Sequence, residues 1–193
     1  MRLEDKVAII TGGANGMGAE EARMFAREGA TVVVADMRDE DGEAVVTQIA
    51  ASGGTGVYVH TDVTSESDWQ RLVDQTVSQF GKLNILVNNA GIFEAHPIDE
   101  VSFAKWQTAW QRTLAVNLAG PANLCWCAVE HMREHGGGRI VNVSSRGAFR
   151  GEPRCPAYGA SKAGLNAMTQ SLAQHVASLG IFVGAVAPGF VET

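Results

Sequence analysis

Tyr158 and Lys162 are the two residues whose types and spacing could move a proton. They lie four residues apart in the segment Tyr158-Gly159-Ala160-Ser161-Lys162, and on a helix that spacing places both side chains on one face. A tyrosine with its ordinary pKa of about 10 is a poor base at neutral pH. A nearby ammonium group stabilises the phenolate and lowers the tyrosine pKa, so the pair could serve as a general acid/base. The spacing alone is a common coincidence, so its meaning depends on the surrounding elements.

A glycine-rich turn near the N-terminus could bind a dinucleotide. A predicted strand over Lys6–Thr11 leads directly into Thr11-Gly12-Gly13-Ala14-Asn15-Gly16-Met17-Gly18, and a helical pattern follows over Gly16–Glu28. Glycine permits backbone conformations and close approaches that a Cβ atom hinders, and the N–H groups at a helix N-terminus suit a pyrophosphate. Such a string can be a plain tight turn, but its place between a strand and a helix is what a dinucleotide site requires.

Two aspartates follow the next two predicted strands. Asp36 could accept hydrogen bonds from the adenosine ribose and would repel a 2′-phosphate, which favours NAD over NADP as the cofactor. It could also be a solvated strand-end carboxylate, and the nearby Arg38 could accommodate that phosphate. Asp62 could bind the adenine amino group, or it could cap the helix that begins near Ser65. The prediction of NAD therefore depends chiefly on Asp36.

Apolar runs and helical patterns alternate along the chain, and this alternation predicts how these residues are positioned. Several runs, such as Val32-Val33-Val34-Ala35, are continuously apolar, as expected of strands covered on both faces of a parallel sheet. We therefore predict one domain over residues 1–193 with a doubly wound, Rossmann-like α/β fold and its ligand site at the carboxyl ends of the strands. The predicted strands are Lys6–Thr11, Thr31–Asp36, Gly56–Thr61, Leu83–Asn88, Gly138–Val143 and Phe182–Ala187, and the predicted helices are Gly16–Glu28, Arg38–Ser52, Glu66–Phe80, Phe103–His135 and Ala157–Leu179.

The composition argues against several classes of function. The formal net charge of −6 argues against a nucleic-acid partner, which usually requires a basic patch. Three cysteines, Cys125, Cys127 and Cys155, are too few and too odd in number for a disulfide framework, which favours reduced thiols and a cytoplasmic location. No apolar stretch is long enough to span a membrane, the N-terminus lacks the pattern of a signal peptide, and no cluster of His, Cys or carboxylate residues suggests a metal.

Two predicted helices carry more apolar surface than one sheet face can cover. Phe103–His135 and Ala157–Leu179 are apolar around most of their circumference, which is typical of helices that are buried on more than one side. We therefore expect a homodimer, or a homotetramer, that forms through these helices.

Further motifs stand in order along the chain: the turn with Thr11, Gly12, Gly16 and Gly18, then Asp62-Val63, Asn88-Asn89-Ala90-Gly91, Asn117, Ser144-Ser145, Tyr158 with Lys162, and Pro188-Gly189 with Thr193. With this ordered set, the chain resembles the short-chain dehydrogenase/reductase family over essentially its whole length. The resemblance implies an oxidoreductase that transfers a hydride between NAD(H) and a secondary alcohol or ketone.

The resemblance also implies a role for each matching residue. Tyr158 would be the general acid/base, Lys162 would bind the nicotinamide ribose and lower the Tyr158 pKa, and Ser145 would hydrogen-bond the substrate oxygen. Asn117 would hold a water that links Lys162 to solvent, a role that a buried amide at a helix kink could share. The cofactor would contact Gly12, Asn15, Gly16, Met17, Gly18, Asp36, Asp62, Val63, Asn89, Ala90, Gly91, Tyr158, Lys162, Pro188, Gly189, Val191 and Thr193, the last of which could instead be frayed.

The C-terminus departs from the family pattern. Family members continue into substrate-covering helices and a seventh strand, whereas this sequence stops at Thr193, so we expect those elements to be missing. The alternative function is then a non-catalytic nucleotide-binding fragment or scaffold. The substrate would be a small molecule of unidentified class. Three arginines, Arg146, Arg150 and Arg154, could hold an anionic group, although solvated loop arginines are the commoner case.

Overall fold

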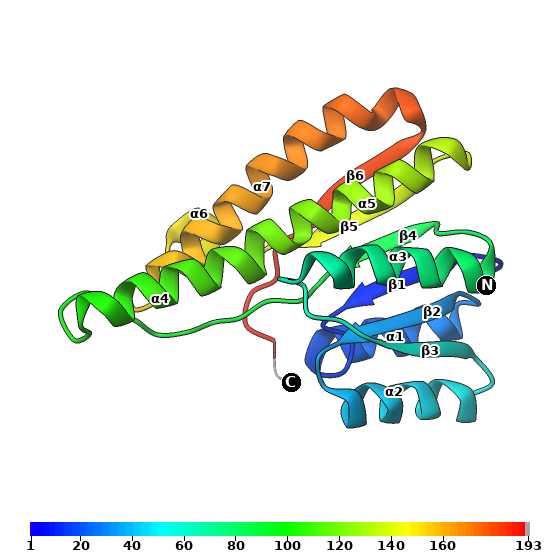
Figure 1. Ribbon diagram of the computed structural model, residues 1–193, viewed down its shortest axis with the longest axis horizontal. Coiled ribbons are helices and arrows are strands. Elements are labelled where there is room, and N and C mark those ends of the chain that lie inside the picture. Colours follow the sequence, from blue (N-terminus) through cyan, green and yellow to red (C-terminus); the bar gives the residue numbers. More distant parts are fainter. Residues whose placement is uncertain (192–193) are drawn as a thin grey trace.

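Six parallel strands form the centre of the molecule, in the order β3-β2-β1-β4-β5-β6. Figure 1 shows the computed structural model, which describes residues 1–191. The chain builds the sheet outward from β1 to β3 and then returns to build outward from β4 to β6, which is the doubly wound topology. The strands are β1 (Val7–Thr11), β2 (Thr31–Asp36), β3 (Thr55–His60), β4 (Ile85–Asn88), β5 (Gly138–Val143) and β6 (Ile181–Val186). The predicted fold class is confirmed.

Helices cover both faces of the sheet. One core cluster packs α1 and α2 against side chains such as Ile10 and Val34, while a second packs α3, α5 and α7 against Ile9 and Ile140. The helical elements are α1 (Gly16–Arg27), α2 (Asp39–Ala51), α3 (Glu66–Phe80), α4 (Phe103–Leu114), η1 (Ala115–Ala119), α5 (Gly120–Glu134), α6 (Gly147–Arg150), α7 (Pro156–Val176) and η2 (Ala177–Leu179). In Figure 1, α4 and the first turns of α7 project past the carboxyl ends of the strands.

The continuously apolar runs are the most deeply buried strands, as predicted. Val32, Val33 and Val34 are all fully buried, because neighbouring residues of a strand point to opposite faces and both faces carry helices. The outer strand β6 differs, since Phe182 is 57% exposed there. Within residues 1–191, no helix combines the length and apolarity that crossing a membrane requires.

The predicted helix Phe103–His135 is in fact interrupted. A π-helical turn, η1, separates α4 from α5. Pro121, near the start of α5, has no N–H group to donate to the carbonyl of Asn117 one turn earlier, and a missing bond of this kind is a usual cause of a wider turn. Asn117 lies at the centre of that turn and is fully buried. The short helix α6 was not predicted, because four residues are too few for a helical periodicity.

Candidate active site

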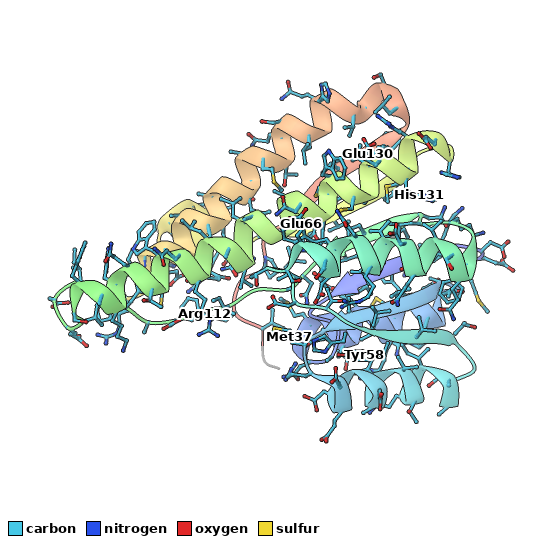
Figure 2. All side chains as sticks on the ribbon, in the orientation of Figure 1. Met37, Tyr58, Glu66, Arg112, Glu130 and His131 are labelled. Carbon is cyan, nitrogen blue, oxygen red and sulfur yellow. The ribbon has the colours of Figure 1, made fainter. Side chains whose placement is uncertain are left out.

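A cavity of about 750 Å³ opens at the carboxyl ends of the strands. It extends from Asp36, at the end of β2, to the segment Gly189–Val191 after β6. Arg112 of α4 and Met37 line it from different sides (Figure 2). The predicted cofactor residues that line it are Gly12, Asn15, Gly16, Met17, Asp36, Asp62, Val63, Asn89, Ala90, Gly91, Gly189 and Val191. Four others, Gly18, Tyr158, Lys162 and Pro188, are not among its lining residues, and Thr193 lies outside the described residues.

The glycine-rich turn has the conformation that its sequence predicts. Gly12 and Gly16 have φ angles of +65° and +53°, which side chains with a Cβ atom rarely tolerate. Asn15 caps α1, because its Oδ1 accepts a hydrogen bond from the Gly16 N–H at 2.8 Å. Gly18 serves the turn without lining the cavity: a Cβ atom there would overlap the Gly12 carbonyl oxygen and lie 2.5 Å from Asn89 Nδ2.

Asn89 ties the end of β4 to this turn. Its Nδ2 donates to the carbonyl oxygens of Thr11 at 2.9 Å and Gly12 at 3.2 Å. In return, the Thr11 hydroxyl accepts from the backbone N–H groups of Asn89 and Ala90, each at 3.1 Å. The floor of the cavity is therefore fixed by side-chain bonds between two neighbouring strands.

Asp36 is held by backbone amides at one end of the cavity. Its Oδ2 accepts from Ala14 N at 3.1 Å and its Oδ1 from Arg38 N at 3.1 Å. The Arg38 side chain lies over this carboxylate, with Nε 3.5 Å from Asp36 Oδ1 and Nη1 3.2 Å from Asp41 Oδ2. The Tyr58 hydroxyl, which lies near Met37 in Figure 2, donates to the Asp36 carbonyl oxygen at 2.6 Å. The carboxylate is thus oriented before any ligand binds.

Asp62 does not cap α3. Its Oδ1 accepts from the backbone N–H of Thr64 at 2.8 Å and from the Thr64 hydroxyl at 2.7 Å, while α3 begins two residues later. Sequence reasoning missed Asp68, whose Oδ2 accepts from Asp62 N at 2.9 Å. That bond and the positive charge of the nearby Arg71 guanidinium lower the Asp68 pKa. Asp68 therefore fixes the loop that carries Asp62 to the cavity wall.

Tyr158 and Lys162 lie on α7, one helical turn apart. Lys162 is buried, and its Nζ donates to the Val143 carbonyl oxygen at 2.7 Å. The same Nζ is 5.8 Å from the centre of the Tyr158 ring. Burial lowers the pKa of Lys162 to about 8. The half-buried Tyr158 ring packs against Phe93 in a T-shaped arrangement, with 4.8 Å between ring centres.

The two serines after β5 have different surroundings. Ser144 is buried, and its hydroxyl donates to the Lys162 carbonyl oxygen at 3.4 Å. Ser145 is only half-buried, and its hydroxyl oxygen accepts from Gly147 N at 3.1 Å, which leaves its proton available. This difference favours Ser145 over Ser144 as the serine that could reach a substrate.

Asn117 is joined to the cavity wall by a pair of backbone bonds. Its Oδ1 accepts from Ile92 N at 2.8 Å, and its Nδ2 donates to Ile92 O at 2.9 Å and to Ser161 Oγ at 3.2 Å. A Cβ atom on Gly91 would lie 3.4 Å from Asn117 Oδ1 and 3.5 Å from Lys162 Nζ. Since Gly91 lines the cavity, the amide and the ammonium group both lie directly behind its wall.

Two of the three loop arginines, Arg146 and Arg154, have protein partners. Arg154 forms a two-pronged pair with Glu100, at 2.8 Å for each bond. The Arg146 guanidinium stacks 3.8 Å from the centre of the Phe190 ring, and its Nε is 3.8 Å from Glu152 Oε1. Phe93 and Phe190 are 61% and 86% exposed, and neither was singled out from the sequence, because isolated loop phenylalanines have no distinguishing pattern.

The burial of Lys162 predicts a pH-dependent stability. Its folded-state pKa of about 8 lies below its ordinary value of 10.5, so the unfolded chain binds more protons between these two values. The free energy of unfolding should therefore rise as the pH increases from about 8 to about 10.5. Replacing the buried ammonium by an apolar group, as in Lys162→Met, should remove this rise and stabilise the protein at pH 7 by about 1–3 kcal/mol. Urea denaturation of both proteins at several pH values tests this, and parallel pH profiles would contradict it.

Comparisons with known proteins match the whole of this architecture. A family model described as "short chain dehydrogenase" matches residues 6–193. A 3-alpha-(or 20-beta)-hydroxysteroid dehydrogenase of Mycobacterium tuberculosis is 41% identical over 192 residues, which cover 100% of this chain and 71% of the relative. Cyclopentanol dehydrogenase of Comamonas testosteroni is 38% identical over 192 residues, 100% of this chain and 75% of the relative.

A solved structure gives the same result. The crystal structure of a Sinorhizobium meliloti protein assigned as a short-chain alcohol dehydrogenase superposes with a TM-score of 0.92 at 32% identity, and the match covers 99% of this chain and 74% of that one. Members of the family are oxidoreductases that use NAD(P). On its sequence, its fold and the arrangement of its cavity, this chain belongs to the short-chain dehydrogenase family.

Proposed function

We propose that this protein transfers a hydride between NAD(H) and a secondary alcohol or ketone, with Tyr158 as the general acid/base. The observation that carries the proposal is the position of Lys162 and Asn117, directly behind the cavity wall at Gly91, with Tyr158 one turn away on the same helix. A dinucleotide in this cavity would have its adenosine at Asp36 and its reactive end near these groups.

The residues present fit a dinucleotide. The turn at Gly12 and Gly16 supplies backbone without side chains, and the first turn of α1 directs the positive end of its dipole toward the cavity. The volume of about 750 Å³ is in the range of cofactor sites, roughly 300–1,000 Å³. Asp36 would accept hydrogen bonds from the ribose hydroxyls, and Gly189–Val191 would lie beside the opposite end of the cofactor.

The chain's own residues would handle the substrate oxygen and its proton. In the oxidation, the Tyr158 oxygen takes the hydroxyl proton of the alcohol, and in the reduction it returns a proton to the forming alkoxide. Ser145 would donate a hydrogen bond to the same oxygen and stabilise its developing charge. Bound NAD⁺ would supply the hydride acceptor.

Lys162 and Asn117 would support this proton transfer. A protonated Lys162 near the Tyr158 ring would stabilise the phenolate by charge attraction. Asn117 would keep Ile92 and the adjoining wall in place and would hold a water between Lys162 and solvent.

The substrate class follows from the relatives and from the surface around Tyr158. The named relatives act on hydroxysteroids and on cyclopentanol, both of which are alicyclic alcohols. Phe93 presents an exposed ring beside Tyr158, and Arg146 is already covered by Phe190 and Glu152. We therefore propose an apolar, ring-containing secondary alcohol rather than an anionic substrate.

Substitution of Asp36 should change the cofactor preference. Asp36→Ser removes the carboxylate that would accept the ribose bonds and leaves Arg38 free to approach a 2′-phosphate. Hydrogen bonds to charged groups contribute roughly 1.5–3 kcal/mol, so the ratio of kcat/KM for NAD⁺ to that for NADP⁺ should fall by about 10- to 150-fold. Glu40→Gln, on the exposed first turn of α2, is the matched control that removes a charge outside the cavity. An unchanged ratio in Asp36→Ser would contradict the assignment of NAD.

Self-association through α5 and α7 is a separate proposal. Trp126 of α5 is 64% exposed, so a large aromatic side chain is available to a second copy of the chain. A homodimer or homotetramer would bury this face. Light scattering that finds a monomer at all concentrations would contradict it.

A further inference from the structure

A fully buried histidine, His96, lies in the loop between β4 and α4 and contacts the first turn of α7, the helix that carries Tyr158. Its Nε2 is 3.2 Å from the backbone nitrogen of Ala157, the residue immediately before Tyr158. The two residues are 61 positions apart in the sequence. His96 is not in the set of motifs that identifies the family, and it does not line the cavity.

The hydrogen bonds of the ring assign its protonation. Nδ1 is 2.8 Å from the carbonyl oxygen of Glu94, and because a carbonyl can only accept, Nδ1 carries the proton. The unprotonated Nε2 then accepts from the Ala157 N–H. The edge of the ring meets Trp106 of α4, with 5.4 Å between ring centres. The imidazole is therefore fixed on three sides in a single tautomer.

The start of α7 needs this acceptor. The first N–H groups of a helix have no partner within the helix. Pro156 has no N–H group, and the N–H groups of Tyr158 and Gly159 both bond to the Cys155 carbonyl oxygen, at 3.0 and 3.4 Å. The remaining N–H, that of the fully buried Ala157, has His96 as its partner. Without that acceptor, a buried donor would lose its hydrogen bond, and the first turn of α7 would have to shift to reach another.

The loop that carries His96 also touches Tyr158 directly. His96 N donates to the Arg154 carbonyl oxygen at 2.8 Å. His96 therefore bonds to the backbone both before and after Cys155, at Arg154 and at Ala157. Phe93, three residues before His96, lies against the Tyr158 ring. The segment between β4 and α4 thus contacts both the first turn of α7 and the ring of Tyr158.

We propose that His96 is a positioning residue for Tyr158: its neutral Nε2 holds the first turn of α7 so that the tyrosine hydroxyl stands where the substrate oxygen binds. This inference rests on the proposed function, in which Tyr158 transfers the proton. Misplacement of a reacting group by about 1 Å can cost about a hundredfold in rate, whereas the adenosine end of the cofactor would bind at the ends of β1 and β2, outside α7.

Three variants test the role of His96. His96→Leu removes the acceptor and should lower kcat by about 10- to 100-fold, with the dissociation constant for NADH changed by less than about twofold. His96→Gln should restore kcat to within about threefold, because the Gln amide oxygen reaches about as far as Nε2 and can accept from Ala157. Glu100→Gln is the control, since it removes the charge from the exposed Glu100–Arg154 pair between the same two segments and leaves His96 in place.

The backbone bond can also be followed directly. Hydrogen exchange of the Ala157 amide should be faster in His96→Leu and protected in His96→Gln. A kcat that stays within about twofold in His96→Leu would overturn the proposal, as would a folded His96→Gln that is as slow as His96→Leu. If His96→Leu does not fold, His96→Asn, which is too short to reach Ala157, replaces it with the same expected loss and the same overturning result. Absence of turnover in the unsubstituted protein would instead refute the proposed function.

Discussion

Tyr158→Phe should abolish turnover while leaving NADH binding intact. The substitution removes one oxygen and keeps the ring, so the contact with Phe93 and the packing of α7 should persist. Since the lost hydroxyl is the proposed proton donor and acceptor, kcat should fall by about 10²–10⁴-fold, the usual contribution of general acid–base catalysis. Steady-state assays in both directions give the loss.

Titration of NADH into the same variant is the internal control. The cavity residues from Asp36 to Gly91 do not include Tyr158, so the dissociation constant should change by less than about threefold. Turnover within about threefold of the unsubstituted protein would refute the acid/base assignment. A variant that loses NADH binding together with turnover would show that Tyr158 mainly shapes the site.

Gly18→Ala should destabilise the fold and weaken NADH binding together. The added methyl group would overlap the Gly12 carbonyl oxygen and would come within 2.5 Å of Asn89 Nδ2, so the turn and its brace from β4 must both move. Overpacking of this kind costs typically about 1–3 kcal/mol. Because the displaced backbone is the floor of the cavity, the dissociation constant for NADH should rise by more than about tenfold.

Gly184→Ala is the matched control for this variant. Gly184 lies in β6, and a Cβ atom there would have no heavy atom within 4 Å, so the free energy of unfolding should be unchanged or slightly higher. Thermal denaturation and NADH titration of both variants give the comparison. Equal effects of the two substitutions would contradict the close approach of α1 to the Gly12 carbonyl.

The central strands could be predicted because they are buried along nearly their whole length. Runs such as Val32–Ala35 are buried on both faces, and a continuously apolar run gives a strong signal for that environment. The helix interruption at Asn117 depends on a local event, the missing N–H group of Pro121 together with the bond from Asn117 to Ile92. The periodicity of apolar residues predicts the helix on either side of this turn, but it gives no sign of the extra residue within the turn.

Most of the residues expected to contact a cofactor line the cavity, and they could be selected from the sequence for a similar reason. Gly12 and Asn15 lie in one contiguous segment, so these residues are close to each other both in sequence and in space. His96 could not be found in this way, because its partner Ala157 follows it by 61 positions. A single histidine in a loop has no spacing to interpret, and only the packed structure shows that it completes the first turn of α7.

Transfer of deuterium from substrate to cofactor would show directly whether the protein catalyses hydride transfer. Secondary alcohols labelled with deuterium at the carbinol carbon, cyclopentanol among them, would be incubated with the protein and NAD⁺, and the reduced cofactor would be examined by mass spectrometry. Direct hydride transfer predicts NADH that carries the label on its nicotinamide ring. Unlabelled NADH, or no reduction of NAD⁺ by any alcohol of the panel, would contradict the account.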